Sequence, residues 1–181
     1  MHILIISPEL PYPLIGGAKI VTYNMIKYLS HIDIKITLIA LADKYSTDNV
    51  FALEKFCKVI LVPLKTENSA LGMLRNLFRS EPYTISKYMS HLVLKKIDKT
   101  IQSENFDLVH VERLHMAYCG KYIKKKYTLP VILRSHNVES VILSRYVKYT
   151  ANILKKYFLN IQSKRLYDYE KSIVKYFDKS V

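Results

Sequence analysis

The sequence has few cysteines and no long apolar run. Its two cysteines, Cys57 and Cys119, are far apart and neither belongs to a CxxC pair, so neither a disulfide framework nor a zinc site is expected. Apolar runs such as residues 3–6 and 59–62 are much shorter than a membrane-spanning helix requires. The first residues also lack the basic region and the cleavage site of a signal peptide. We therefore expect buried thiols, no transmembrane segment and a cytoplasmic location.

Acidic residues are scarce as well. The chain carries 28 Lys and Arg against 15 Asp and Glu, which gives a formal net charge of +13. This excess predicts attraction to polyanions such as phosphorylated ligands, an anionic lipid surface or nucleic acid. Nucleic acid is disfavoured because the sequence has no RNP, KH or helix-turn-helix signature. Tyrosines are interleaved with lysines in residues 121–127, which fits either a membrane interface or a plain solvated helix face.

Short β-branched runs alternate with helical patterns along the chain. Strands are expected over residues 2–6, 34–40, 59–62, 107–111 and 131–133. Helices are expected over residues 20–29, 50–57, 68–79, 92–101, 116–126 and 141–177. With right-handed crossovers, this order predicts an α/β fold, a doubly wound and mostly parallel sheet with helices on both faces, Rossmann-like. At 181 residues one domain is expected, and its last residues resemble the approach to another strand of a truncated chain.

Two of the expected helices carry distinctive apolar residues. Residues 68–79 place Leu71, Leu74, Leu77 and Phe78 on one face beside two arginines. This face either lies on a membrane or, as is commoner, packs on the sheet. Residues 141–177 contain no Pro or Gly, which predicts one uninterrupted helix. Regularly spaced apolar residues mark the stripe that we expect this helix to bury: Ile153, Leu154, Tyr157, Phe158, Ile161, Leu166, Tyr169, Ile173 and Tyr176.

A pair of glycines, Gly16 and Gly17, lies between the first strand and the first helix. Adjacent glycines let a backbone approach a ligand closely, and the N-terminus of the helix favours an anion such as a phosphate. Ligands of open α/β sheets bind at this carboxyl edge. A purely structural turn is the alternative. The segment has neither the dinucleotide pattern GxGxxG nor the Walker A pattern, so NAD binding and ATP hydrolysis are disfavoured.

Four polar side chains follow the strand expected at 131–133. They are Arg134, His136, Asn137 and Glu139, and they share the same carboxyl edge. A histidine, an amide and a carboxylate can hydrogen-bond sugar hydroxyls or a donor phosphate, and Arg134 can pair with an anion. Helix capping is the alternative, because an Asn or the preceding Ser, followed by Glu139, is typical of a helix N-terminus. The two roles are compatible.

Further candidates follow two other strands. Glu112 and Arg113 end the strand expected at 107–111, where they either line an acceptor pocket or pair with each other or with neighbours to shape the loop. His110 alternates with apolar residues, which favours a satisfied core histidine. Glu9 is a lower-ranked candidate at the same rim. We expect the diglycine and the histidine at position 136 to lie in one cleft.

Together these segments resemble a known family. The opening strand with Pro-x-Pro at 11–13 and Gly-Gly at 16–17, Asp-Leu-Val-His-Val-Glu at 107–112, and Ser-His-Asn-Val-Glu at 135–139 before a long helix are similar to the N-terminal domain of family 4 retaining glycosyltransferases, one half of the GT-B fold. The resemblance covers essentially the whole chain, 1–181. It implies that this is the acceptor-side domain and that a C-terminal donor-binding domain is absent from the chain.

The resemblance also implies roles for the candidate residues. Gly16 and Gly17 would contact the diphosphate of a nucleotide-sugar donor, and His136 would be the catalytic histidine near the transferred sugar. Contacts to the acceptor or the sugar would come from the remaining candidates: Glu112, Arg113, Arg134, Asn137 and Glu139. The leaving diphosphate would be stabilised by the glycine loop and basic residues.

The expected reaction transfers a sugar, with retention, from a nucleotide sugar to a glycan or lipid-linked acceptor in surface polysaccharide or glycolipid synthesis. No metal or other cofactor is expected, and the fragment is expected to be inactive without its second domain. Basic helices would attract it to the inner face of the cell membrane. Two alternatives stay open, a non-catalytic module that binds a polyanion or nucleic acid, and another GT-B enzyme such as a sugar-nucleotide epimerase.

Overall fold

Six parallel strands form one sheet in the order β3-β2-β1-β4-β5-β6. The structure is a computed structural model that describes residues 1–43 and 47–181. The strands are β1 (His2–Ser7), β2 (Lys35–Leu41), β3 (Lys58–Val62), β4 (Leu108–Glu112), β5 (Val131–Arg134) and β6 (Lys179–Ser180). All five predicted strands are confirmed, and the last residues of the chain pair with β5 as a further strand.

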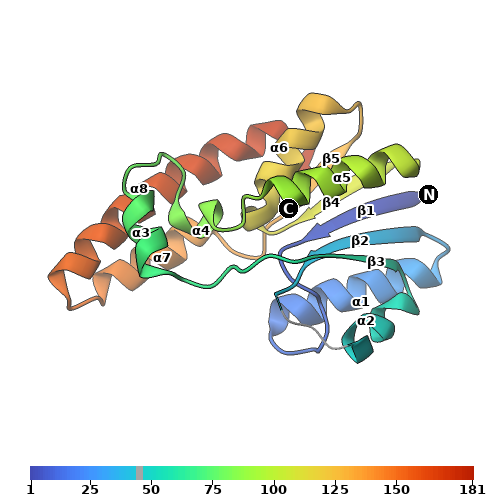
Figure 1. Cartoon of the computed structure of the whole chain (residues 1–181), viewed down its shortest axis with the longest axis horizontal. Helices are drawn as coiled ribbons and strands as arrows, with labels where there is room; N and C mark the ends of the chain where they lie inside the picture. Colours follow the sequence, from blue (N-terminus) through green and yellow to red (C-terminus); the bar gives the residue numbers. More distant parts are fainter. Residues whose placement is uncertain (44–46) are drawn as a thin grey trace.

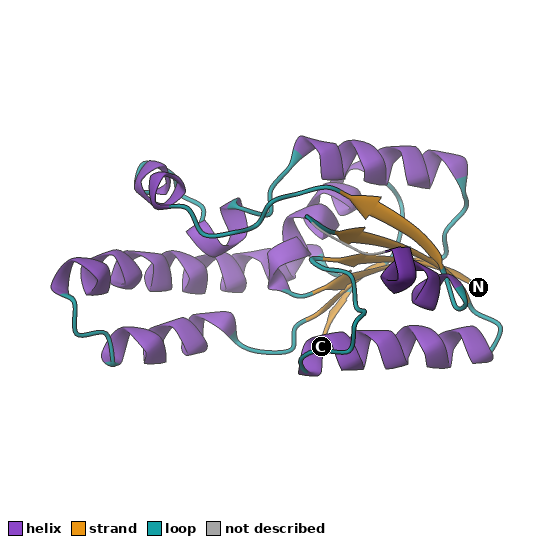
Figure 2. Ribbon diagram, turned by 60° about the horizontal axis from the view of Figure 1, so that its bottom comes forward, coloured by secondary structure: helices purple, strands orange, loops and turns teal. Residues whose placement is uncertain are grey.

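Helices cover both faces of this sheet (Figures 1 and 2). The α-helices are α1 (Gly17–His31), α2 (Thr47–Glu54), α3 (Ala70–Asn76), α4 (Tyr83–Ser86), α5 (His91–Ser103), α6 (Ala117–Lys126), α7 (Glu139–Lys148) and α8 (Ile153–Ile173). Two short 3₁₀ helices are η1 (Leu114–Met116) and η2 (Val174–Tyr176). The predicted doubly wound, Rossmann-like α/β fold is therefore confirmed.

Alternation along β1 explains the two layers of helices. Leu4 and Ile6 pack into a core with α5, α6 and α8, whereas Ile3 and Ile5 pack into a second core with α1 and α2. Successive side chains of a strand point to opposite faces, and a strand that is apolar at every position can therefore bury both. Each fully buried Leu or Ile contributes about 1.5–3 kcal/mol. The continuous apolar run thus places β1 in the middle of the sheet.

The prediction of a single helix over residues 141–177 is wrong, because the segment forms the hairpin of α7 and α8. Asn152 starts α8, and its Oδ1 accepts a hydrogen bond from Lys155 N at 2.9 Å. An Asn at an N-cap can end one helical segment and begin the next even where the sequence has no Pro or Gly. Figure 2 shows the hairpin extending away from the sheet.

The buried stripe predicted for this segment is also only partly right. Leu166 and Ile173 are buried in the core. Ile153, Leu154 and Tyr157 are exposed, since the first turns of α8 lie beyond the sheet, where α7 packs beside them. Helical spacing identifies an apolar face, but it does not show whether another element covers that face.

The predicted amphipathic helix at residues 68–79 is present as α3. Leu71, Leu74 and Phe78 are exposed and only Leu77 is half-buried, so the prediction that this whole face packs on the sheet is wrong. The helix is held elsewhere, because Arg165 of α8 donates hydrogen bonds to the carbonyls of Asn76 and Leu77 at 2.8 and 2.9 Å. Its apolar face is left toward solvent.

The N-terminus of α7 is capped from α8. Glu170 accepts hydrogen bonds from Glu139 N at 3.1 Å and Ser140 N at 3.3 Å, and also from the Ser140 hydroxyl. The predicted capping by Ser135 or Asn137 is wrong, since the cap position is Val138. A carboxylate from the other helix of the hairpin satisfies these backbone groups instead.

We expect Glu170→Ala to lower the free energy of unfolding by about 1–2 kcal/mol, because two backbone donors of α7 lose their acceptor. Urea unfolding followed by circular dichroism measures this loss. Asp168→Ala, which removes an exposed carboxylate from the same helix, is the control and should change stability little. Equal losses in the two variants would contradict the capping role.

Candidate functional site

The candidate side chains gather where β1, β4 and β5 end. Chain order runs from β1 to β2 and β3 on one side of the sheet and continues through β4, β5 and β6 on the other. The junction of β1 and β4 is thus the topological switch point, beyond whose carboxyl ends ligands of open α/β sheets bind. The loops that leave these strands carry the diglycine, Arg113 and His136.

Glu112 is the centre of a polar cluster at this edge. Its side chain is 0% exposed, and one oxygen lies 2.9 Å from His110 Nε2 and 3.4 Å from Arg134 Nη1. The other oxygen lies 3.0 Å from His136 Nε2 and 3.3 Å from Thr22 Oγ1. A single buried carboxylate therefore joins α1, β4, β5 and the loop after β5.

The balance of charges keeps Glu112 ionised. Burial by itself raises the pKa of the carboxyl, but hydrogen bonding and charge from His110, then the contacts of His136 and Arg134, outweigh it and hold the pKa below its usual range. An ionised carboxylate accepts hydrogen bonds and donates none. Glu112 consequently requires its neighbours to present N–H or O–H groups to it.

The diglycine begins α1 at the same edge. Gly16 is the cap residue, with φ 90°, a conformation that favours glycine. A Cβ added to Gly16 or to Gly17 would meet no atom within 4 Å. The turn therefore needs glycine at position 16 for its backbone conformation, while the glycine at position 17 leaves space open beside the N-terminus of the helix.

Thr22 connects this helix to His136. It follows Gly17 by five residues, about 7.5 Å along a helix axis, and its hydroxyl reaches the Glu112 oxygen that also contacts the imidazole. The structure thus brings the diglycine helix and the histidine to one cluster. That Gly16, Gly17 and His136 lie in one cleft stays a prediction, because the observed link runs through Thr22.

A second ion-pair group lies beside the first. Glu9, directly after β1, pairs with Arg113 after β4 and with Lys19 of α1 at 3.4 Å. Arg113 has φ 65°, an unusual conformation for a residue other than glycine. Of the two alternatives for Glu112 and Arg113, pairing with neighbours is observed, and the two residues do not pair with each other.

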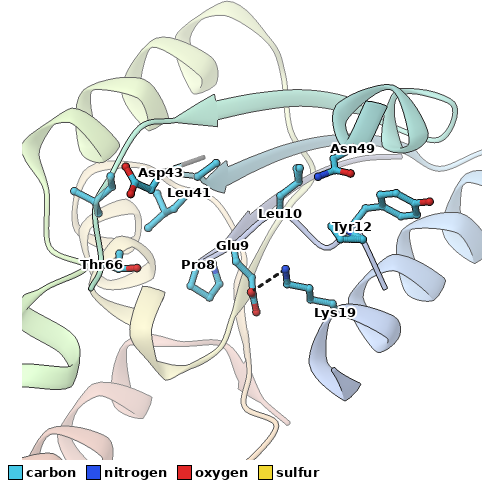
Figure 3. A pocket seen from close by; sticks show the side chains of 12 residues that line it. Pro8, Glu9, Leu10, Tyr12, Lys19, Leu41, Asp43, Asn49 and Thr66 are labelled. Atoms are coloured by element: carbon cyan, nitrogen blue, oxygen red, sulfur yellow. Dashed lines mark ion pairs between the residues drawn. The ribbon is translucent and has the colours of Figure 1, made fainter. Parts of the chain in front are cut away.

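A cavity of about 240 Å³ opens beyond the ends of β1, β2 and β3. Glu9, Lys19, Asp43 and Thr66 line it together with apolar residues, and Figure 3 shows the Glu9–Lys19 pair at its edge. Neither the diglycine nor His136 lines this cavity. Thr22 of α1 and His136 belong to the Glu112 cluster, but the described cavity belongs to the neighbouring part of the rim.

Asn137 lies in the loop after β5, and Glu139 is the first residue of α7. Asn137 is exposed and lines a cavity of about 500 Å³ that also borders Glu170. Burial, and next the charge of Glu170, raise the pKa of Glu139 above its usual range. Neither residue contacts Glu112 directly, although the charges of Arg113 and His136 also act on Glu139 and lower its pKa.

Thr22 and Lys19 were missed by the sequence analysis. Both lie within α1, where a threonine or a lysine carries no local signal for a site. Their partners, Glu112 and Glu9, are 90 and 10 residues away in sequence, so only the packing of α1 on the sheet brings the pairs together. His110 is the core histidine that was predicted, and it also contacts Glu112, because residues two apart on a strand share a face.

His115 is a half-buried histidine close to this site, and its Nδ1 atom is buried. Its ring centroid lies 4.9 Å from that of Tyr88, and its Nδ1 has no hydrogen-bond partner among residues 1–43 and 47–181. Burial, followed by the positive charges of Arg113 and Lys87, lowers its pKa to about 4. The imidazole is therefore neutral at pH 7.

Comparison with descriptions of known protein families finds no match. The chain is 28% identical over 148 residues to an uncharacterized glycosyltransferase of Methanocaldococcus jannaschii. The match covers 80% of this chain but only 35% of that protein. The chain therefore spans about a third of the length of this relative.

Among solved structures, the fold is similar to sucrose-phosphate synthase from Thermosynechococcus elongatus, with a TM-score of 0.60 and 13% sequence identity. The superposition covers 99% of this chain and 41% of the synthase chain. At this identity the likeness concerns the fold alone. It shows that the whole chain has the architecture of one Rossmann-like part of a longer GT-B chain.

We expect His115 to make stability depend on pH. Its pKa is about 4 when folded and about 6.5 when unfolded. The unfolded state thus binds more protons between these values, and the stabilisation that is present above pH 6.5 is lost as pH falls toward 4. Between pH 7 and pH 5 the loss is about 2 kcal/mol.

Urea unfolding at both pH values, with His115→Phe as the comparison, measures this contribution. Phenylalanine keeps a ring against Tyr88 but does not titrate, so the variant should lose about 2 kcal/mol less than the unmodified protein over this range. The same pH dependence in both proteins would show that His115 is not the titrating group.

Proposed function

We propose that this chain is the N-terminal, acceptor-side domain of a glycosyltransferase that uses a nucleotide-sugar donor. The named activity of the curated relative and the GT-B-type fold support this proposal. The donor-binding second domain would lie outside this chain, so the chain by itself would not catalyse transfer. Retention of configuration, a cytoplasmic location, and an acceptor that is a glycan or a lipid-linked sugar are parts of the same proposal.

One observation carries it: the N-terminal half of α1 and His136 are joined through Glu112 at the switch point of the sheet. Glycosyl transfer from a nucleotide sugar needs two things at adjacent positions, a site for the leaving diphosphate and a polar group beside the sugar. The N-terminus of a helix favours an anion. The histidine supplies the polar group.

In this proposal Gly16 and Gly17 bind the diphosphate. The open space where a Cβ would stand allows phosphate oxygens to approach the backbone, and the positive end of the α1 dipole stabilises the negative charge of the leaving group. Arg134 and Arg113 add positive charge at the same edge. No resident metal or other cofactor is invoked.

We assign His136 to the sugar. Its Nε2 lies against the ionised Glu112, so Nε2 carries a proton and Nδ1 is the ring atom left to contact a hydroxyl of the sugar. Glu112, which is fully buried, acts by orienting this ring and Arg134. Asn137 and Glu139 stay proposed contacts to the acceptor or the sugar. Synthesis of a surface polysaccharide or glycolipid is the proposed setting.

We expect His136→Ala to lower kcat by about 10²–10⁴-fold, the range for loss of a positioned polar group at a reaction centre. Release of nucleoside diphosphate from a panel of nucleotide sugars, measured with the full-length enzyme, tests this. His91→Ala, which removes an exposed histidine at the start of α5, is the matched control. Undiminished transfer by His136→Ala would refute the assignment.

The substitution Gly17→Ala distinguishes a role of Gly17 in ligand binding from a purely structural role. A methyl group at this position meets no protein atom, so folding stability should be unchanged or slightly higher. The methyl group would occupy the space proposed for phosphate, and the Kd for UDP, GDP or ADP, whichever binds, should rise by about 10-fold or more. Calorimetric titration measures it. Loss of stability with unchanged affinity would indicate a structural turn.

A further inference from the structure

The hairpin of α7 and α8 ends in large side chains that nothing in the described part of the chain covers. We call Tyr149, Ile153, Leu154 and Tyr157 the hairpin tip. Their side chains are 88%, 82%, 83% and 69% exposed. Positions 153, 154 and 157 lie on one side of the first turn of α8, so the tip presents a continuous apolar face. Scattered exposed apolar residues are ordinary, but a cluster of this kind indicates a contact surface.

The charged residues of the segment that forms the hairpin tip have one sign. Residues 140–167 contain no Asp or Glu, and they contain six basic residues, Arg145, Lys148, Lys155, Lys156, Lys164 and Arg165. Lys155 donates a hydrogen bond to the Tyr146 hydroxyl at 2.9 Å and lies over its ring. Tyrosine and lysine side chains with an apolar stem and a polar end are suited to the boundary between water and lipid.

Helix α3 adds a second apolar and basic surface at the same end of the molecule. Leu71, Leu74 and Phe78 are exposed, Phe78 at 90%, and Arg75 and Arg79 are beside them. Hydrogen bonds from α8 fix the end of α3. Both views show α3 and the hairpin lying together, away from α1 and α2 (Figures 1 and 2).

We propose that the hairpin tip, assisted by α3, attaches this protein to an anionic lipid bilayer. Protruding Ile, Leu and aromatic side chains enter the boundary of the acyl chains, and the lysines and arginines around them contact anionic headgroups. Residues 140–167 carry no carboxylate that such a surface would repel. In the part of the chain that the structure describes, no helix is long and apolar enough to cross a bilayer.

Nucleic acid is a poorer match for the same surface. Basic residues alone would suffice to bind phosphates, and the exposed Ile153 and Leu154 would remain in water. A bilayer accounts for the apolar and the basic residues together. The attachment does not rest on the proposed transferase activity, because it depends only on the exposed surface and its charge.

A tryptophan reporter tests insertion directly, since the chain contains no Trp. Leu154→Trp should show a blue-shifted emission when vesicles of phosphatidylcholine with about 30% phosphatidylglycerol are added. Phe51→Trp places the same reporter at an exposed position of α2 and should show no shift. An unshifted Leu154→Trp spectrum, or equal shifts for both reporters, would overturn the proposal.

Vesicle flotation of the full chain gives a second measurement. The double variant Ile153→Ser with Leu154→Ser loses both apolar anchors. Its affinity for the anionic vesicles should therefore fall by about 10-fold or more. The matched pair Tyr28→Ser with Phe51→Ser, also exposed, should bind as the unmodified protein does. Binding should weaken between about 0.1 M and about 1 M salt.

Two other occupants of the tip would give distinct results. If the tip binds a second copy of the chain, sedimentation velocity would show a dimer, and the double serine variant would be monomeric. If a downstream part of a longer chain covers the tip, the cysteine of the Ile153→Cys variant would be protected from maleimide labelling in the absence of vesicles. Either result overturns the proposal. If the unmodified full-length protein transfers sugar to a water-soluble acceptor but does not bind vesicles, the attachment alone is refuted. If it binds vesicles but transfers no sugar, the proposed function alone is refuted.

Discussion

Glu112 is a carboxylate that the fold holds completely away from water. An unpaired charge at such a position would cost several kcal/mol, so the groups around it are required to be present together. Two imidazoles, a guanidinium and a hydroxyl supply its contacts. They come from β4, β5, the loop after β5 and α1. Satisfying this one charge therefore fixes how two strands, one loop and one helix meet at the carboxyl edge.

This arrangement prepares the edge of the sheet for a ligand before any ligand binds. The imidazole of His136 is oriented by its contact with Glu112 rather than by solvent, and α1 is held with its glycine start at the same edge. A site whose polar groups are already in position loses less free energy to reorganisation when charge develops. The neighbouring pair of Glu9 and Arg113 extends the same principle across the switch point, with strained backbone at Arg113.

The far end of the molecule follows a different constraint. Around the sheet, the apolar residues of β1 and its neighbours are buried on both faces. At the hairpin, Ile153 and Leu154 are exposed, whereas burial in a core would stabilise the protein by about 1.5–3 kcal/mol for each of them. The side chains that remain exposed lie in a segment without acidic residues. The protein thus combines a rigid polar edge with an apolar, basic projection.

The five main strands, their parallel direction and the edge at which the polar residues gather could be predicted from the sequence. A strand that is buried on both faces must be apolar at every position, and parallel crossovers have one hand. The sequence also identified Gly16, Gly17, Glu112 and His136 as neighbours of that edge. Only the tertiary structure decided that α7 and α8 form a hairpin, that Glu170 caps α7, that Thr22 reaches Glu112, and that the apolar faces of α3 and of the first turn of α8 are exposed. Local spacing records which side of a helix is apolar, whereas the partner of that side, and of any buried charge, comes from residues far away in the chain.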